Sequence, residues 1–382
     1  MKSKGKRLLI LGATAGEISL VKRAQEFGIY VIVTDNHKDY SLAPAKYIAD
    51  EAWDISWSDI DLLEKKCVDN HIDGVLAGYS EFRVENMIKL CERLNLPCYI
   101  NSEQLDITRD KIKFKECCRR YGVPVVREYK SIEEVDKFPV IVKPTDRAGS
   151  IGISIANNLK ELEKAYQYAY EMSVEKRVII EEYIYKADKV DFYYLAENGQ
   201  LTLLTSCDTI NAKNNGFSKV VQSAWLYPEK NLKSYNLKVK ENIEKMIHGM
   251  NIKYGCVFFS GFVDENNEFV FFECGYRLEG AHQYYYSQKR GPLNFLDTFI
   301  FHSLYGNTSM VKRTSINENM KCVTINVFAK SGIIAQIAGV QQIESMEDCT
   351  KSLLYGRIGQ QCDDSRRFWT KFMFLHLVVN LQ

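Results

Sequence analysis

The sequence predicts a protein of mixed α/β and α+β class, and three observations support this prediction. Strand-like and helix-like stretches alternate over residues 8–105, which is typical of a parallel sheet covered by helices. From Pro139 onward the pattern becomes rich in strands, and the residues after 310 again contain strand-like runs. A chain of 382 residues is too long for one simple core, so we expect two or three lobes around a cleft.

The first part of the chain is expected to hold three strands and two helices. The first strand is a continuous apolar run, which is typical of a strand buried on both faces. The expected strands are Leu8–Ala13, Tyr30–Thr34 and Asp73–Ala77, and the expected helices are Glu17–Phe27 and Glu81–Leu94.

The turn from Gly12 to Gly16 follows the first strand, at the carboxyl end where ligands bind to open α/β sheets. Asp35 closes the second strand and could hold a ribose hydroxyl. A dinucleotide site, and with it a nicotinamide-dependent oxidoreductase, is therefore one hypothesis. Because the glycine spacing is not G-x-G-x-x-G, a tight strand-to-helix turn is the favoured interpretation.

The central and final parts are expected to be strand-rich. Residues 106–121 are predicted as one helix with Asp106 or Thr108 as N-cap, ended by Gly122-Val123-Pro124. Asp264–Asn267 is predicted as a hairpin turn. The remaining expected helices are Leu159–Met172 and Leu237–Met250, and the expected strands are Val140–Lys143, Ile151–Ala156, Val178–Tyr183, Val190–Ala196, Leu201–Ser206, Cys256–Val263, Glu268–Cys274, Cys322–Ala329, Ile333–Ile337 and Phe368–Leu381.

Charge and cysteine content narrow the class of protein. The formal net charge is +1 and neither sign forms a long block, which argues against a general nucleic-acid binder. The eleven cysteines contain no C-x-x-C pair, so we expect reduced thiols in a cytoplasmic protein. The basic start is followed by an apolar run that stops at Gly12, which indicates a strand and no signal peptide, and no stretch is expected to span a membrane.

Five short motifs follow one another in an order that suits a nucleoside triphosphate. Such a ligand needs cations on its phosphates, backbone N–H donors, an apolar slot for the base and a carboxylate for magnesium. Each motif alone is weak, and their order makes the combination specific. The motifs are Asp110-Lys111, Ile141–Pro144, Arg147–Gly152, Ile179–Ile184 and Glu273–Arg277.

In these motifs the chain resembles the ATP-grasp superfamily, which includes D-alanine–D-alanine ligase, biotin carboxylase, carbamoyl-phosphate synthetase and L-amino acid ligases. The resemblance implies the ATP-grasp fold, with a Rossmann-like preATP-grasp domain at residues 1–105. An ATP-grasp domain would follow at 106–310, with a small lid lobe at about 113–183 and a larger lobe at about 184–310. Residues 311–382 would form a small C-terminal β-rich subdomain.

The resemblance assigns phosphate contacts to Lys111, to Lys143 and to the glycine-rich loop. Lys111 opens a helix, where a lysine gains nothing from the helix dipole. Lys143 ends a buried strand, where an ammonium needs an anion to offset its desolvation. The loop residues implied in covering the triphosphate with backbone N–H groups are Arg147, Gly149, Ser150 and Gly152.

The resemblance also implies which residues bind the purine base and the ribose. Glu181, Glu182, Tyr183 and Ile184 match the hinge whose backbone reads the adenine edge. Asp191 matches the acid that binds ribose hydroxyls. Asp188 is a rival for that role because the spacing from Glu181 to Asp191 is slightly long.

Metal binding and phosphoryl transfer are assigned to the last motif. Glu273, at the end of an apolar strand, would bind magnesium, with Mn²⁺ as an alternative ion, and Arg277 would stabilise the transferring phosphoryl group. The chain departs from the family twice: Ser260 stands where an acidic or amide ligand is usual, and Gly275 stands where E-x-N-x-R has asparagine. Glu279 is the residue expected to compensate as a metal ligand.

Other polar residues keep two readings. The stretch Asp208–Ser223 is either a substrate loop, through Lys213, Asn214, Asn215 and Lys219, or a solvated surface loop. His282 could act near an acceptor amine, and Tyr284–Tyr286 are more typical of core.

The function that the resemblance implies is an ATP- and magnesium-dependent ligase that joins a small carboxylate to an amine through an acyl phosphate. Arg277 and Lys143 are its expected catalytic residues. The alternative from Ser260 and Gly275 is an ATP-binding sensor or partner subunit with weak or no turnover. Dimers are common among such ligases, so a homodimer is an expectation to test.

Overall fold

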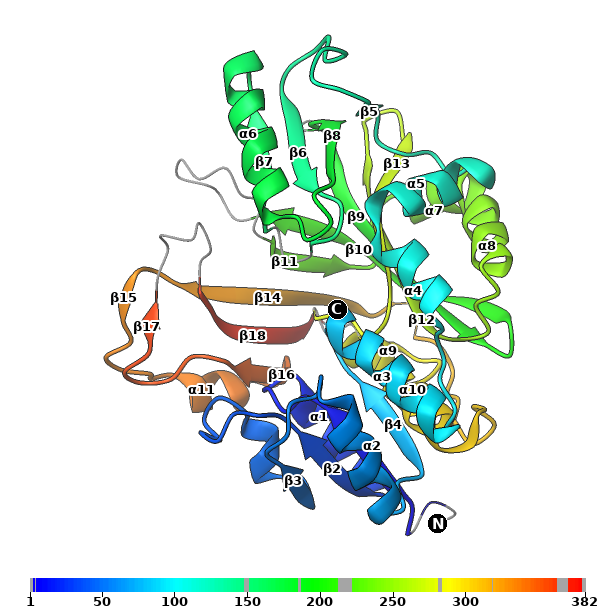
Figure 1. Cartoon of the computed structure of the whole chain (residues 1–382), viewed down its shortest axis with the longest axis vertical. Coiled ribbons are helices and arrows are strands. Elements are labelled where there is room, and N and C mark those ends of the chain that lie inside the picture. The colour runs from blue at the N-terminus through cyan, green and yellow to red at the C-terminus, as the bar shows by residue number, and fades with distance from the viewer. Residues whose placement is uncertain are drawn as a thin grey trace.

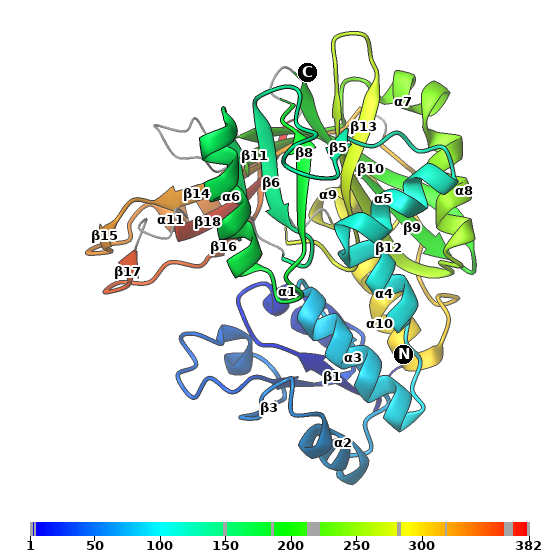
Figure 2. The ribbon, with the colours of Figure 1, turned by 45° about the horizontal axis from the view of Figure 1, so that its top comes forward.

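The structure is a computed structural model of the 382-residue chain. It places the N-terminal parallel sheet at one end of the molecule and a small antiparallel sheet at the other, with a large sheet between them (Figure 1). In the turned view of Figure 2 the N-terminal sheet again lies at the lower end, and the lid strands overlap the large sheet. The structure describes all residues except 1, 2, 4, 148–150, 185–186, 212–221, 281–283, 318, 363–369 and 380–382.

The N-terminal sheet is parallel throughout, in the strand order β3-β2-β1-β4. Its strands are buried almost without interruption because helices cover them, which confirms the predicted α/β pattern. The three-residue β3 and the helix α2 were not predicted. The bounds are β1 (Arg7–Leu11), α1 (Glu17–Glu26), β2 (Tyr30–Thr34), η1 (Pro44–Tyr47), β3 (Glu51–Trp53), α2 (Ile60–Asp69), β4 (Gly74–Ala77) and α3 (Glu81–Leu94).

The helix predicted over residues 106–121 was wrong in one respect, because two helices occupy this region. They are α4 (Ser102–Arg109) and α5 (Lys111–Arg120). The N-caps are Asn101 and Asp110, instead of Asp106 or Thr108. Asp110 has an extended backbone, and its carboxylate accepts hydrogen bonds from the N–H groups of residues 112 and 113, so the helix ends and restarts there.

The small lid sheet has the order β5-β8-β6-β7 and is antiparallel. Helix α6 packs on one face through its apolar side, and Leu162, Ala165 and Ala169 lie in the lid core. The strand predicted from Ile151 begins only at residue 154, because Gly152 adopts a φ of +75° in a turn. The bounds are β5 (Glu128–Tyr129), β6 (Val140–Pro144), β7 (Ser154–Ala156), α6 (Leu159–Met172) and β8 (Val178–Glu182).

The large sheet is antiparallel, in the order β13-β12-β9-β10-β11-β14-β18-β16. Strands β14, β18 and β16 from the last part of the chain therefore continue the central sheet, and the predicted boundary at residue 310 remains a prediction. The bounds are β9 (Asp188–Glu197), β10 (Gln200–Asn211), β11 (Gln222–Tyr227), β12 (Tyr254–Val263), β13 (Phe269–Tyr276), β14 (Lys321–Ala329), β16 (Cys349–Leu354) and β18 (Thr370–Val379).

Two further predictions need correction. The strand expected at Ile333–Ile337 is reduced to β15 (Gly332–Ile333), because its partner β17 (Gln361–Cys362) offers only two residues to pair with. The helix expected at Leu237–Met250 is split into α7 (Leu232–Lys238) and α8 (Lys240–Gly249) at Val239, whose φ of −132° is not helical. The other helices are α9 (Tyr284–Arg290), α10 (Phe295–Tyr305) and α11 (Val340–Glu344).

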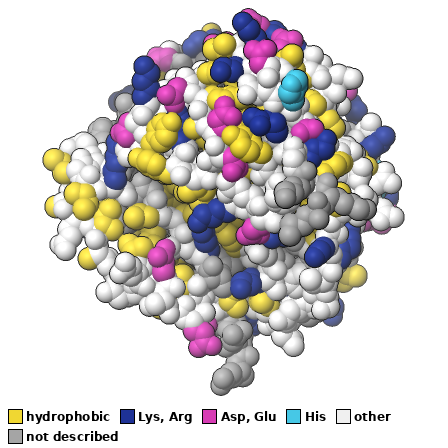
Figure 3. Space-filling model, turned by 90° about the horizontal axis from the view of Figure 1, so that it is seen from below, with side chains coloured by type: hydrophobic (Ala, Val, Ile, Leu, Met, Phe, Trp, Pro, Cys, Tyr) yellow, Lys and Arg dark blue, Asp and Glu magenta, His cyan; other side chains and the backbone are white. Residues whose placement is uncertain are grey.

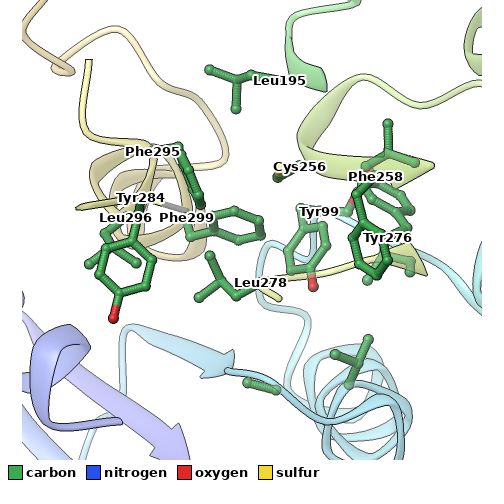
Figure 4. Packing of buried hydrophobic residues seen from close by; sticks show 14 of the residues in the cluster. Tyr99, Leu195, Cys256, Phe258, Tyr276, Leu278, Tyr284, Phe295, Leu296 and Phe299 are labelled. Atoms are coloured by element: carbon green, nitrogen blue, oxygen red, sulfur yellow. Dashed lines mark hydrogen bonds between the residues drawn. The ribbon is translucent and has the colours of Figure 1, made fainter. Parts of the chain in front are cut away.

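A cluster of aromatic side chains joins α10 to the end of β13 (Figure 4). The centroid of the Tyr99 ring lies 5.3 Å from that of the Tyr276 ring and 4.8 Å from that of the Phe299 ring. The Tyr276 hydroxyl donates to the Tyr99 carbonyl oxygen over 2.6 Å and also contacts the Tyr254 carbonyl. The backbone just before Arg277 is thus held by buried contacts.

The cysteines and the surface charges are arranged as the sequence indicated. All eleven cysteines are free thiols. On the face seen in Figure 3, side chains of both charges are interspersed and neither sign forms a large patch. No helix in the described part of the chain has the length and apolarity needed to cross a membrane.

Candidate active site

Three predicted residues from three neighbouring strands stand side by side on the central sheet. Ser260 on β12 lies directly opposite Asp191 on β9 and Glu273 on β13, and directly opposite residues of antiparallel strands share one face. The Ser260 Oγ donates to Asp191 over 2.5 Å. The structure therefore brings the predicted metal residues Glu273 and Ser260 together.

The carboxylate of Asp191 is occupied inside the sheet. Besides Ser260, it accepts from Thr209 Oγ1 over 2.8 Å and lies 3.3 Å from Lys189 Nζ. Asp188, the rival for ribose binding, is paired with Lys230 Nζ at 2.6 Å. The ribose role of either acid stays a prediction.

The predicted phosphate ligand Lys143 is held by a buried carboxylate. Its Nζ lies 2.5 Å from Glu181 Oε2, and the second Glu181 oxygen contacts Lys115. Burial acts to raise the pKa of Glu181, but the charges of Lys143 and Lys115 outweigh it, and the pKa is lowered. Glu181 thus stays ionised and fixes the position of the Lys143 side chain.

Lys115 is a site residue that the sequence reading missed. It is fully buried and donates to the Val126 carbonyl oxygen over 2.9 Å. The available signal was its position four residues after Lys111 on one helix, which places both lysines on the same side.

Lys111 joins the start of α5 to the loop after β6. Its Nζ donates to the Arg147 carbonyl oxygen over 2.8 Å and lies 3.4 Å from the Thr145 carbonyl oxygen. Burial lowers the pKa of Lys111, and the charge of Lys143 lowers it further, against the raising effects of Glu273 and Glu81. Both predicted lysines therefore belong to one electrostatic cluster.

A small hollow, with a free volume of about 10 Å³, lies at this cluster. Its wall contains three cations and two carboxylates, of which Glu81 and Arg109 were not predicted. The lining residues are Glu81, Thr108, Arg109, Lys111, Phe114, Arg147, Glu273 and Cys274.

Part of the predicted glycine-rich loop is described. Arg147 Nε donates to the Met172 carbonyl oxygen over 2.7 Å. A Cβ on Gly152 would lie 2.6 Å from Pro144 Cγ, so only glycine fits there. Gly149 and Ser150 lie outside the described residues.

The predicted hinge leaves one amide group available. The N–H of Glu182 donates to the Arg127 carbonyl over 2.9 Å, and the N–H of Tyr183 donates to the Pro139 carbonyl over 3.2 Å. The Glu182 carboxylate pairs with Lys137 at 3.0 Å. Among the described residues the Ile184 N–H has no hydrogen-bond partner, so it is the hinge donor that a purine edge could use.

Arg277 reaches across to the N-terminal domain. Its Nη2 and Nε lie 3.2 and 3.4 Å from Glu81 Oε1 at the start of α3, and its Nη1 donates to the Leu278 carbonyl over 3.1 Å. The guanidinium also lies 5.4 Å from the centre of the Phe258 ring. Arg277 is therefore fixed at the wall of the hollow.

The glycine at position 275 has a packing reason. Gly275 lies opposite Phe258, and a Cβ on it would come within 2.4 Å of the Phe258 ring. The usual asparagine cannot occupy this position while that ring supports Arg277.

Glu279, the third predicted metal ligand, interacts electrostatically with Asp191 of the central sheet. Tyr193 OH donates to its Oε2 over 3.1 Å. Burial and the charge of Asp191 raise the pKa of Glu279 to about 7, against the lowering effects of Arg277 and Lys189. Within the described residues no group of three or more His, Cys, Asp or Glu side chains forms a ready-made metal cage.

The glycine turn of the N-terminal domain is filled by the protein itself. The Glu17 carboxylate accepts from the Thr14 N–H over 2.8 Å and lies 2.8 Å from Arg83 Nη1. A Cβ on Gly12, whose φ is +105°, would lie 2.3 Å from that arginine. A carboxylate thus occupies the helix N-terminus where a dinucleotide would place its pyrophosphate. Asp35 is engaged as well, because it accepts from the His37 N–H over 2.9 Å.

The remaining predicted residues divide into two groups. Residues 212–221, with Lys213, Asn214, Asn215 and Lys219, and also His282, lie outside the described residues. Tyr284 and Tyr286 are buried on α9, and Tyr286 stacks on Tyr227 with centroids 4.8 Å apart, as expected for core residues.

Comparison with known proteins finds one matching family and several related sequences. The family described as D-ala D-ala ligase C-terminus matches residues 117–273. The 2-oxoglutarate carboxylase small subunit of Hydrogenobacter thermophilus is 27% identical over 302 residues, covering 72% of this chain and 62% of that protein. The D-alanine–D-alanine ligase of Fusobacterium nucleatum is 37% identical over 76 residues, covering 20% of this chain and 26% of that protein. The chain thus spans less than two thirds of the length of these curated relatives.

Solved structures agree in fold. The L-amino acid ligase from Bacillus licheniformis superposes with a TM-score of 0.79 at 17% identity, covering 98% of this chain and 93% of that one. The biotin carboxylase domain dimer of the Hydrogenobacter thermophilus 2-oxoglutarate carboxylase, in complex with MgADP, ADP and bicarbonate, gives a TM-score of 0.79 at 18% identity, covering 98% and 86%. The chain has the ATP-grasp fold and belongs to the ATP-grasp superfamily.

Proposed function

We propose that this protein is an ATP- and magnesium-dependent ligase that activates a carboxylate as an acyl phosphate and joins it to an amine. The observation that carries the proposal is the cluster around one hollow. Lys111, Arg147 and Glu273 line that hollow, and Arg277 is anchored at its wall through Glu81. This cluster offers the charges that a triphosphate and a transferring phosphoryl group require.

The nucleotide is proposed to lie between the lid and the central sheet. Lys143, held by its contact with Glu181, would bind a phosphate, and Lys111 would offset its own desolvation by doing the same. The free Ile184 N–H would read the purine edge. Gly149 and Ser150 would add backbone donors over the phosphates.

The residues present fit a magnesium ion bound together with nucleotide. Among the described residues the Glu273 carboxylate has no hydrogen-bond or ion-pair partner, and it faces a hollow lined by oxygen donors and cations. Magnesium usually takes one or two protein carboxylates plus substrate phosphates, so a cage of three side chains is not required. Glu273 would be the main ligand, with Ser260 and Glu279 beside it, and the ion would neutralise phosphate charge.

The reaction then needs two bond exchanges. A carboxylate oxygen of the substrate bonds to the γ-phosphorus, the β–γ bridging bond breaks, and ADP leaves. The amine nitrogen, as the free base, then bonds to the acyl carbon, the bond to phosphate breaks, and inorganic phosphate and a proton are released. Arg277 would hold the transferred phosphoryl group, and positioning supplies most of the rate enhancement.

Carboxylation is a second candidate function, because one of the relatives above is a carboxylase subunit and one solved relative holds bicarbonate. In this case bicarbonate would take the place of the carboxylate substrate. The first half of the reaction and its residues would be the same, and the acceptor would differ.

The deciding experiment measures ADP formed from Mg-ATP with pooled amino acids, with pooled organic carboxylates, and with bicarbonate alone. We expect amino acids or carboxylates to stimulate ADP release, and Lys143→Ala and Glu273→Ala to abolish the stimulation. Stimulation by bicarbonate alone would favour the carboxylase instead. No release with any pool, together with ATP binding by calorimetry, would favour the nucleotide sensor, and preference for NAD over ATP would reject all three.

A further inference from the structure

Glu81 is an acid at the hollow whose only role above is to anchor Arg277. It is the first residue of α3, so it comes from the N-terminal domain, whereas Glu273 comes from the central sheet. Both line the same hollow. The charge of Glu81 acts on Lys111, whose pKa it raises against the effect of burial, so the carboxylate faces the cluster.

Only half of the Glu81 carboxylate is engaged. Arg277 contacts Oε1 with both Nε and Nη2, at 3.4 and 3.2 Å. Oε2 has no hydrogen-bond or ion-pair partner among the described residues. Arg277 therefore fixes the carboxylate in position and leaves one oxygen directed to a ligand or to solvent.

The neighbouring cations are already committed. Arg109 is paired with Glu85 at 2.7 Å, and Lys111 donates to two backbone carbonyls. A carboxylate ion is a hydrogen-bond acceptor only, and it binds charged donors more strongly than neutral ones. The open oxygen of Glu81 therefore favours a cationic donor and disfavours an anionic nucleophile such as a thiolate.

We propose that Glu81 binds the acceptor amine in its ammonium form, which releases one proton to solvent before the nitrogen attacks, and so selects amines as the nucleophile. This inference rests on the proposed ligase function. The pair with Arg277 places the ammonium beside the group that would hold the acyl phosphate, so the two reactants meet across one ion pair. Glu81 is then a specificity-determining residue contributed by the N-terminal domain to a site whose phosphate ligands belong to the other lobes.

The test compares a charged and an uncharged nucleophile. Hydroxylamine is largely uncharged near neutral pH and converts acyl phosphates to hydroxamates, whereas the standard amino acids present ammonium groups. Wild type and Glu81→Gln are assayed with Mg-ATP and the pooled carboxylates, for hydroxamate with hydroxylamine and for amide product with amino acids. Glutamine keeps an oxygen for Arg277, so the first half-reaction is preserved.

We expect hydroxamate formation by Glu81→Gln to fall far less than amide formation, with a KM for the amine raised about 10–100-fold and a smaller change in kcat. Glu81→Asp should fall between the two because it keeps the charge at a shorter reach. Glu92→Gln is the matched control, since Glu92 is an exposed acid on the same helix. It should behave as wild type with both nucleophiles.

The outcomes separate this inference from the function on which it rests. If Glu81→Gln loses both products equally, or neither, Glu81 does not select the amine and the inference is overturned while the ligase stands. If wild type makes neither hydroxamate nor ADP, the ligase fails, and the inference fails with it.

Discussion

Two glutamate–arginine pairs share the first turn of α3, and they differ in how completely the carboxylate is satisfied. Arg83 pairs with Glu17 of its own domain, and that fully buried carboxylate also accepts from the N–H and Oγ1 of Thr14. Glu81, two residues earlier, pairs with Arg277 of the central domain and is engaged through one oxygen.

The difference separates a structural charge from one that can bind a ligand. Both oxygens of Glu17 are bonded, and Gly12 gives Arg83 the room to reach it, so this end of the N-terminal sheet is closed. Among the described residues, one oxygen of Glu81 and the carboxylate of Glu273 have no partner, and both residues line the hollow. A carboxylate that the fold leaves half-satisfied next to cations is therefore the better sign of a site than a glycine turn at a strand end.

The largest effect is expected when the ion pair of Glu17 and Arg83 is broken. Arg83→Met leaves Glu17 buried without its cation, so the free energy of unfolding should fall by about 3–5 kcal/mol in guanidinium titrations at neutral pH. The double variant Glu17→Gln, Arg83→Met should recover part of this loss. Nucleotide affinity of the folded protein should not change, and a parallel loss of ATP binding would contradict the structural role.

The next effect concerns the open acid of the cleft. Glu273→Gln should lower ADP formation about 100–1000-fold, because the proposed magnesium ligand loses its charge. Its thermal stability should stay equal to that of wild type or rise, since an unpartnered carboxylate is removed. An activity loss matched by a loss of stability would place Glu273 with the structural acids instead.

A third buried carboxylate sharpens the comparison because it has no arginine at all. Burial raises the pKa of Glu229 to about 7, and the nearby Asp208 adds to the rise. A raised folded-state pKa contributes stability that is present below the unfolded value of about 4.5 and is lost as pH rises through about 7. Glu229→Gln lacks this pH-dependent loss. The difference in free energy of unfolding between the variant and wild type should therefore be about 2–3 kcal/mol more favourable to the variant at about pH 8 than at about pH 5.

The measurement is denaturant unfolding at both pH values. Glu265→Gln is the control, because Glu265 is exposed in the β12–β13 turn. A Glu229→Gln difference that does not vary with pH would show that this acid is ionised throughout.

The smallest expected effect concerns the cleft backbone. Gly275→Ala brings a Cβ against the Phe258 ring and should cost about 1–2 kcal/mol of stability. Adding Phe258→Leu should relieve most of this cost and weaken the support of Arg277, seen as a lower rate of ADP formation. Wild-type stability in Gly275→Ala alone would show that the ring moves aside freely.

The elements that could be predicted from the sequence are those with a local signal. Long apolar runs predicted β1, β2 and β9, and the order of the motifs indicated the superfamily. The motif reading placed a helix start at Lys111, which the structure confirms, but the helical spacing across residues 106–121 hid the separate helix that ends before Asp110.

Partners were the part that could not be predicted. Lys143 was recognised as a buried lysine, but its carboxylate is shared with Lys115, and that contact depends on how α5 packs against β8. The pair of Glu81 and Arg277 joins residues 196 positions apart, so no local pattern reports it. From the sequence Gly275 was a departure from the family motif, and its packing reason depends on Phe258 on the opposite strand.

Helix α10 sets a limit on how the lobes can move. Its residues from Phe295 to Leu304 are buried on every side, and it packs against both β4 and β12. Pulling the N-terminal sheet away would expose this whole apolar helix to water, at a large cost in free energy. The lid is joined by ion pairs such as Arg177 with Asp110, which exchange readily for water contacts. We therefore expect opening of the cleft to involve movement of the lid, while the N-terminal and central parts stay together.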